Sequence, residues 1–345
     1  MIYFKKWVEK LLEMILVKKF DCGITRISSK HLKKDKEIEA VRSISLDMSK
    51  ISNARLDFRA LSKMRKLRFL RVYNSQHGED NAQRIFSLCN HGNELKVFQH
   101  LQSFPNGLTF FSLSGYPFKS VPKHFLPKTL VRLDMPFNKV KHWNGVEELE
   151  NLIDVDLSFS QHMKELPNLS KATNLQSLNL SYCKSLLKIT PSSIQNLNKL
   201  VNLDLYGCSR LISLPDGIQS ERIDLSYCND LKMAPKISCK VEVLLLRETS
   251  IKESPFIEQP SRLVELDLSE CSSLETLSSS ICKVKFLKEL NLFGCSKLER
   301  LPDDFGDLEA SGFVIKEVPT SITSIVTSFE ITNINFFQLF QIGFT

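Results

Sequence analysis

The 345-residue chain lacks the features that mark membrane proteins and secreted proteins. No apolar run approaches the roughly 18 residues that a helix needs to span a bilayer. Near the N-terminus, Lys5, Lys6, Glu9 and Lys10 interrupt the apolar core that a signal peptide requires. We therefore expect no membrane span and a cytoplasmic or nuclear location.

Motifs for enzyme chemistry are also missing. No glycine in the chain is followed by lysine, so the sequence contains no phosphate-binding loop of the GxxxxGKS/T type. The 7 histidines are scattered without the spacing of metal ligands, and no serine lies in a nucleophile elbow. We therefore expect a non-enzymatic protein with no cofactor and no metal.

The sequence does contain a repeat, which is clearest between Leu175 and Leu214. Six positions recur there after 25 residues: Leu175, Leu178, Leu180, Cys183, Leu186 and Ile189 are followed by Leu200, Leu203, Leu205, Cys208, Leu211 and Leu214. Nine repeats are visible, with first positions at Leu108, Leu130, Leu152, Leu175, Leu200, Ser220, Val241, Leu263 and Leu287. Their steps of 20 to 25 residues are typical of leucine-rich repeats, whose period is roughly 20–29 residues.

Within each repeat, a residue that lies n places after the first position is called position +n. Positions +3 and +5 are apolar, which predicts a short strand with one buried face. One repeat cannot fold alone, because burying five or six apolar side chains contributes roughly 8–18 kcal/mol, whereas ordering about 22 residues costs roughly 30 kcal/mol. Stacked repeats share their buried faces and pair their strands.

The predicted fold class is therefore α/β. We expect a curved leucine-rich-repeat solenoid with a parallel β-sheet on its concave face and an irregular or short-helix convex face. Prolines that follow the strands, such as Pro167, Pro215 and Pro302, favour an extended outer segment over a long helix.

Five of the 9 cysteines belong to the repeat. Cys183, Cys208, Cys228, Cys271 and Cys295 occupy position +8, where other repeats have Asn138, Ser160 or Thr249. This pattern indicates a buried turn position, and the remaining cysteines show no paired spacing, so we expect reduced thiols. Cys228-Asn229-Asp230 resembles the Cys-x-Asp nucleophile of bacterial leucine-rich-repeat ubiquitin ligases, but the place of Cys228 in the repeat favours a structural role.

The predicted domain organisation has four parts. They are a basic N-terminal helix and linker (1–40), an N-terminal cap with degenerate repeats and an insertion (41–107), the repeat array (108–310), and a degraded repeat with an apolar tail (311–345). The apolar stripe of residues 4–20 is compatible with membrane binding, but it more often marks a helix that packs on a neighbouring element.

Charge is unevenly distributed along the chain. Residues 1–75 carry 19 Lys and Arg against 8 Asp and Glu, a net charge of +11, so the remaining 270 residues carry −4. A basic segment can bind nucleic acid or face another protein domain. Because the basic residues alternate with core leucines and lack a nucleic-acid motif, a protein domain is favoured.

Several phrases resemble the repeat region of plant intracellular immune receptors. They are SISLDMSKI, ALSKMRKLRFLRVYNS and, most specifically, ELPNLSKATNLQSLNLSYC. The class that they resemble combines a Toll/interleukin-1-receptor domain, a nucleotide-binding domain and C-terminal leucine-rich repeats. The resemblance covers about residues 40–322, although the chain departs from the usual pattern near Leu113 and at Lys139 to Trp143. The sequence carries neither of the first two domains, so their nucleotide switch and NAD-cleaving activity are not transferred to it.

Candidate partner-binding residues lie at positions that alternate with the core and therefore project from the concave wall. Position +4 is Asp or Asn in most repeats, and Phe and Tyr are frequent at positions +6 and +7. The candidate surface comprises Asp156, Phe159, Tyr182, Asp204, Tyr206, Asp224, Tyr227, Asp267 and Phe293. The alternative is that the Asp and Asn side chains hydrogen-bond between adjacent strands while the rings cover the turn. Regular repetition suits a scaffold as well as a surface, so both interpretations stay open.

The resemblance implies a non-enzymatic recognition module in plant defence. Such a module senses pathogen effectors or guarded host proteins and regulates a nucleotide-binding domain that this chain does not contain. The expected partners are a protein ligand and that nucleotide-binding domain, with no nucleic acid. Arg65, Arg68 and Arg71 are candidates for docking on the nucleotide-binding domain. The alternative function is that of a repeat adaptor that supplies substrates to a ubiquitin ligase.

Overall fold

The computed structural model describes residues 40–47, 61, 64–73, 104–116, 118–123, 125–144, 146–307 and 314–315. The chain divides into two compact units, which are described separately. The N-terminal unit comprises Met1–Leu157 with Lys171–Thr173, and the C-terminal unit comprises Ser158–Ser170 with Asn174–Thr345. The helix predicted at residues 4–20 lies outside the described residues, as does most of the predicted apolar tail.

The N-terminal unit is built on parallel strands that pair in chain order. They are β1 (Ser43–Asp47), β2 (Phe69–Tyr73), β3 (Phe110–Leu113), β5 (Arg132–Asp134) and β7 (Asp154–Asp156). Strand β2 pairs directly with β3, with Leu70 opposite Phe111, although a long insertion separates the two in the sequence. A second parallel pair, β4 (Ser120–Val121) with β6 (His142–Trp143), precedes the 3-10 helix η3 (Val146–Glu148).

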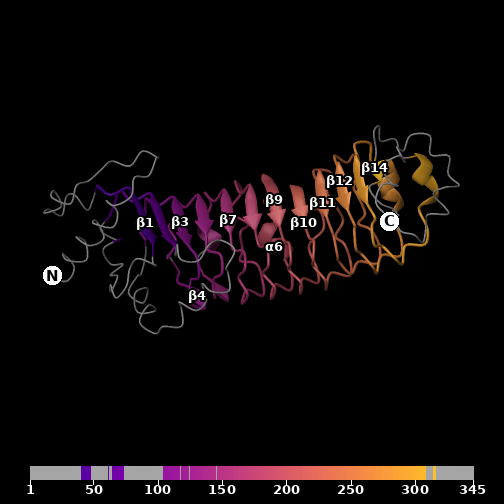
Figure 1. Cartoon of the computed structure of the whole chain (residues 1–345). Helices are drawn as coiled ribbons and strands as arrows, with labels where there is room; N and C mark the ends of the chain where they lie inside the picture. The colour runs from indigo at the N-terminus through magenta and orange to yellow at the C-terminus, as the bar shows by residue number, and fades with distance from the viewer. Residues whose placement is uncertain are drawn as a thin grey trace, which may run out of the picture. The chain divides into compact units, whose positions relative to one another are not determined.

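The C-terminal unit continues the same pattern with strands that lie side by side in chain order (Figure 1). They are β8 (Ser177–Asn179), β9 (Leu200–Asp204), β10 (Ser220–Asp224), β11 (Val243–Leu245), β12 (Glu265–Asp267), β13 (Glu289–Asn291) and β14 (Val314–Ile315). Position +3 of each repeat lies opposite position +3 of the next, as Leu203 lies opposite Ile223. This register confirms a parallel leucine-rich-repeat solenoid and stacks equivalent side chains of successive repeats.

The core consists of the apolar positions that the repeat predicts. The first position and positions +3 and +5 are buried in all nine repeats. Ser220 is the one polar residue at a first position, and it is 0% exposed. Its hydroxyl donates to the carbonyl oxygens of Val201 at 3.1 Å and Arg222 at 2.9 Å, so the most degenerate repeat keeps its strand through hydrogen bonds.

The outer side of the repeats is irregular, as predicted. In the part of the chain that the structure describes, its helices in the C-terminal unit are α6 (Pro191–Ile194), η4 (Ser279–Lys283) and η5 (Asp303–Asp307). Isolated parallel bridges, such as Glu165 with Lys188, connect successive repeats where no helix forms.

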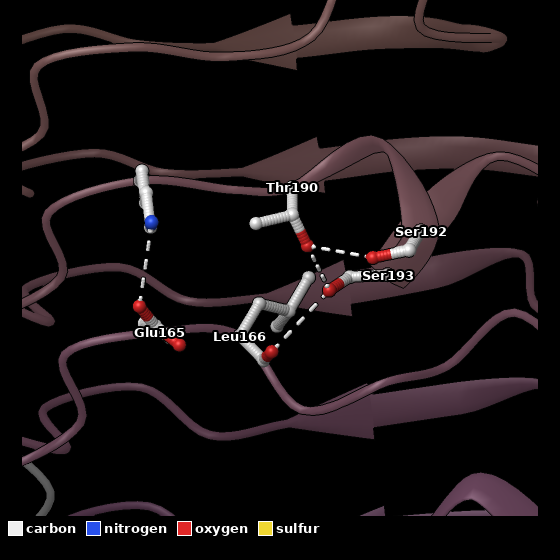
Figure 2. A network of polar contacts seen from close by, with 6 residues as sticks. Glu165, Leu166, Thr190, Ser192 and Ser193 are labelled. Atoms are coloured by element: carbon white, nitrogen blue, oxygen red, sulfur yellow. Dashed lines mark hydrogen bonds and ion pairs between the residues drawn. The ribbon is translucent and has the colours of Figure 1, made fainter.

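Polar side chains join these outer segments (Figure 2). The hydroxyl of Thr190 lies 2.8 Å from that of Ser193 and 3.1 Å from that of Ser192. Ser193 in turn donates to the carbonyl oxygen of Leu166 in the preceding repeat, at 3.4 Å. These contacts connect α6 and its N-cap residue Thr190 to the preceding repeat.

Candidate protein-binding surface

Each strand ends in a turn that recurs from repeat to repeat. The face of the sheet that points away from the core is called the strand face here. Position +7 has a left-handed backbone in every repeat. The φ angles are 75° at Gly115, 59° at Phe137, 58° at Phe159, 56° at Tyr182, 69° at Gly207, 63° at Tyr227, 55° at Glu248, 60° at Glu270 and 72° at Gly294. A non-glycine residue costs roughly 1–2 kcal/mol in this conformation. Glycine at three of these nine places is the signal of this turn in the sequence.

The Asp and Asn side chains of position +4 hold this turn. Their Oδ1 atoms accept the backbone N–H of position +6: Asn179 from Ser181 at 2.9 Å, Asp204 from Tyr206 at 2.9 Å, Asp224 from Ser226 at 3.0 Å, Asp267 from Ser269 at 2.9 Å and Asn291 from Phe293 at 3.1 Å. These bonds lie within one repeat and do not join adjacent strands, which corrects that detail of the scaffold interpretation. Since Asp and Asn make the same bond, the turn does not require the negative charge.

Aromatic side chains of four successive repeats form a continuous row, called the aromatic ladder here. The ring centroids of Phe159 and Tyr182 are 4.7 Å apart and stacked, those of Tyr182 and Tyr206 are 5.2 Å apart, and those of Tyr206 and Tyr227 are 5.0 Å apart. All four rings are half-buried. The guanidinium of Arg247 lies 5.9 Å from the Tyr227 centroid and continues the row.

The phenol groups of the ladder interact with each other. Partial burial raises the pKa of Tyr206 to about 12, and hydrogen bonding to Tyr182 and Tyr227 acts in the same direction. Tyr206 therefore stays neutral at physiological pH and can donate or accept a hydrogen bond.

The structure brings together only part of the predicted surface. Phe159, Tyr182, Tyr206 and Tyr227 form the ladder, with Asp204 and Asp224 at the ends of strands β9 and β10. Asp267 and Phe293 belong to later repeats, where Phe293 is 48% exposed. Asp156 is half-buried on β7 of the N-terminal unit.

The predicted docking residues Arg65, Arg68 and Arg71 are all exposed in the N-terminal unit. Arg71 lies on β2 with its guanidinium 5.0 Å from the Tyr73 centroid. Arg68 precedes the strand and donates to the carbonyl oxygen of Leu67 at 3.3 Å.

A second aromatic contact in this unit was missed from the sequence. Phe69 of β2 stacks on Phe110 of β3 with a centroid distance of 4.3 Å, and the guanidinium of Arg132 lies 5.7 Å from the Phe110 centroid. Arg132 also pairs with Asp134 at 2.9 Å and with Asp154 at 3.1 Å. The two phenylalanines occupy position +2, which is not aromatic in the later repeats, so periodicity could not identify them.

The cysteines of position +8 are structural. Each is 0% exposed, and the thiols of Cys208, Cys228, Cys271 and Cys295 donate to the carbonyl oxygen at position +5 of the preceding repeat, at 3.1–3.4 Å. Burial raises the pKa of Cys228 to about 12, and that of Cys208 well above its usual value. A buried, protonated thiol is a poor nucleophile, so the Cys-x-Asp interpretation of Cys228 has no support.

Neither a metal centre nor a membrane segment is found where the structure describes the chain. Within those ranges, no group of three or more His, Cys, Asp or Glu residues could hold a metal ion. No helix among these residues is long enough and apolar enough to cross a bilayer.

The stacked strands, buried leucines and repeated turns define a leucine-rich-repeat protein. The Leucine Rich Repeat family matches residues 174–197 and 286–308. The chain is 39% identical over 310 residues to Disease resistance-like protein DSC1 of Arabidopsis thaliana, covering 87% of this chain and 24% of that protein. It is 33% identical over 277 residues to Disease resistance protein RML1A of the same plant, covering 76% of this chain and 26% of that protein. The chain is therefore a leucine-rich-repeat relative of plant disease resistance proteins, which confirms the resemblance seen in the sequence.

The chain spans about a quarter of the length of these two relatives. Among solved structures, one similar chain is in the structure titled plant peptide hormone receptor RGFR1 in complex with RGF2. The match covers 82% of this chain and 50% of that chain, with a TM-score of 0.44 and 18% sequence identity.

Proposed function

We propose that the chain is a non-enzymatic recognition module of a cytoplasmic plant defence receptor and binds a pathogen effector or a guarded host protein on the strand face of its C-terminal unit. The aromatic ladder is the observation that supports this proposal. Half-exposed tyrosines supply a large contact area at a small loss of side-chain entropy, and tyrosine is enriched among the residues that dominate protein interfaces.

The backbone of the turn does not require an aromatic side chain, which supports the binding interpretation of these residues. Position +7 holds the same left-handed turn when it is Glu248 or Glu270, and so does Gly294. Phe159, Tyr182 and Tyr227 therefore adopt a strained backbone conformation that does not depend on an aromatic side chain. A role in binding explains why aromatics follow each other in four successive repeats.

We further propose that the module regulates a nucleotide-binding domain through a different surface. The exposed Arg65, Arg68 and Arg71 of the N-terminal unit provide positive charge for this contact. An intramolecular contact of this kind would be weakened by salt, because exposed charges are screened.

Affinity capture from extracts of infected plants tests the proposed function. We expect the triple variant Tyr182→Ala, Tyr206→Ala and Tyr227→Ala to lose proteins that the wild type captures. The matched control is Phe256→Ala with Phe286→Ala, which removes exposed aromatics (53% and 62% exposed) from outside the ladder. Identical captured proteins for the wild type and the tyrosine variant, both folded by circular dichroism, would contradict the proposal.

A further inference from the structure

The regular pattern of the strand face is broken at β11. Position +4 is Asp or Asn on the neighbouring strands, but on β11 it is Leu245, which lies between Asp224 of β10 and Asp267 of β12. Val243 precedes it on the same face, and both side chains are half-buried. An apolar side chain cannot make the hydrogen bond that holds the turn in the other repeats, so the scaffold does not explain Leu245.

Two carboxylates lie directly beside this apolar step. Glu265 is opposite Val243, and Asp267 is opposite Leu245, on the same face of β12. Both acidic side chains are half-buried, and no described cation lies within ion-pair distance of either. Partly burying an unpaired carboxylate is unfavourable.

The nearby arginines interact with other groups. Arg222 lies 3.7 Å from the carboxylate of Asp224 on its own strand β10. Arg247 lies over the ring of Tyr227, which also belongs to the β10 repeat. Both arginines thus contact residues of the β10 repeat, on one side of Leu245. The carboxylates of Glu265 and Asp267 lie on β12, on the other side of Leu245, and neither arginine pairs with them.

The turn after β12 also contains an unsatisfied hydroxyl group. Ser269 is 3% exposed, and its Oγ has no hydrogen-bond partner among the residues that the structure describes. In the equivalent turn of an earlier repeat, the hydroxyl of Ser181 bonds to Oδ1 of Asn179 at 2.8 Å. The Ser269 hydroxyl thus differs from its equivalent in the Asn179 repeat, because it makes no bond to the Asp267 carboxylate.

We propose that Glu265 and Asp267, with Val243 and Leu245, form a subsite for an arginine side chain of the partner protein. The aliphatic part of an arginine would lie on the two apolar side chains, while its planar guanidinium would donate to the two carboxylates. The subsite lies on β11 and β12, the two strands that follow the β10 repeat with the last ring of the ladder, so one extended partner segment can reach both. This inference rests on the proposed function and specifies the charge of the partner.

The chain itself provides the variant that tests the charge without breaking the turn. Asn179 and Asn291 make the turn hydrogen bond with an amide oxygen, so Asp267→Asn keeps this bond and removes only the charge. Combined with Glu265→Gln, it removes two negative charges from β12. Asp303→Asn with Asp304→Asn removes the same charge at two exposed positions of η5 and is the matched control.

The probe is a capped peptide that contains one tyrosine and one arginine, with a counterpart in which citrulline replaces arginine. Methyl NMR of Leu245, assigned with a Leu245→Met variant, reports binding at the subsite. We expect a saturable shift of the Leu245 methyl signals in the wild type and in the control. We expect at least about tenfold weaker binding in the Glu265→Gln, Asp267→Asn variant, and no shift with the citrulline peptide.

Three results would overturn the inference. They are no shift in the wild type at millimolar peptide, equal affinity in the wild type and the β12 variant, and equal shifts with arginine and citrulline. None of them affects the tyrosine-dependent capture, so the subsite can fail while the proposed function stands. If the tyrosine variant captured the same proteins as the wild type while the arginine-dependent shift of Leu245 persisted, the proposed function would fail and the subsite would stand.

Discussion

At the scale of single residues, the most regular positions of the repeat serve the backbone. The thiol of Cys208 fills a position that is 0% exposed and donates to the carbonyl oxygen of Leu180 at 3.2 Å. The Oδ1 atom of Asp204 accepts the N–H of Tyr206. Residues that repeat strictly are therefore explained by the fold, whereas the ladder tyrosines and Leu245 are not.

The first prediction concerns the buried thiol position. Cys208→Arg should lower the free energy of unfolding by roughly 4 kcal/mol or more, because it places an unpaired charge among packed side chains. Cys239→Arg, at an exposed cysteine, should change it by less than about 0.5 kcal/mol. Urea denaturation of both variants provides the measurement. Similar losses in the two would mean that position +8 is not buried.

At the scale of elements, the turn that follows each strand fixes where the ladder rings lie. Gly207 has a φ of +69°, and a Cβ atom added there would lie 2.9 Å from Cδ1 of Tyr182. Real Cβ atoms do not approach so closely, so glycine both adopts the left-handed turn and leaves room for the tyrosine ring. In the repeat of Gly207, the aromatic residue is accordingly Tyr206, which lies at position +6 instead of position +7.

The second prediction separates these two roles of glycine. Gly207→Ala should destabilise the protein by about 1 kcal/mol more than Gly217→Ala, because the latter has a similar φ of +68° but meets no atom within 4 Å. Only the Gly207 variant should change the near-ultraviolet circular dichroism of the tyrosines. If both variants behaved alike, the contact between Gly207 and Tyr182 would not position the ladder.

The sequence predicted the strands and the core because both depend on the repeated leucine spacing. Strands β1 and β2 lie within the region predicted as a cap with degenerate repeats (41–107), and a long insertion follows the second. Details that depend on backbone angles were not predicted, such as the left-handed turn and the role of Asp and Asn in holding it. The Phe69–Phe110 stack was missed because its two residues are far apart in the sequence and position +2, which they share, is not aromatic in the later repeats.

For the candidate site, the sequence predicted residue types and their alternation but not their contacts. Alternation placed the aromatics on the strand face, yet only the structure shows that the rings of Phe159, Tyr182, Tyr206 and Tyr227 touch in succession. The unpaired carboxylates of Glu265 and Asp267 depend on where neighbouring arginines point, which periodicity cannot give.

At the scale of the whole molecule, the chain corresponds to about a quarter of the disease resistance proteins that it resembles. The proposed function requires the chain to meet a protein ligand and to contact a nucleotide-binding domain. The charge of the chain is divided accordingly, with +11 in residues 1–75 and −4 in the remainder. We therefore propose two surfaces for these contacts, a basic one in the N-terminal unit and an aromatic, acidic one in the C-terminal unit.

Parallel pull-downs with both partners test this assignment most directly. The partners are the receptor's nucleotide-binding domain, supplied in trans, and a protein that the tyrosine variant fails to capture. The triple variant Arg65→Glu, Arg68→Glu and Arg71→Glu should lose the nucleotide-binding domain and keep the ligand. The Tyr182→Ala, Tyr206→Ala and Tyr227→Ala variant should do the opposite, with a loss of about 1–2 kcal/mol or more per central contact. Loss of both interactions in either variant, with folding intact by circular dichroism, would contradict the account.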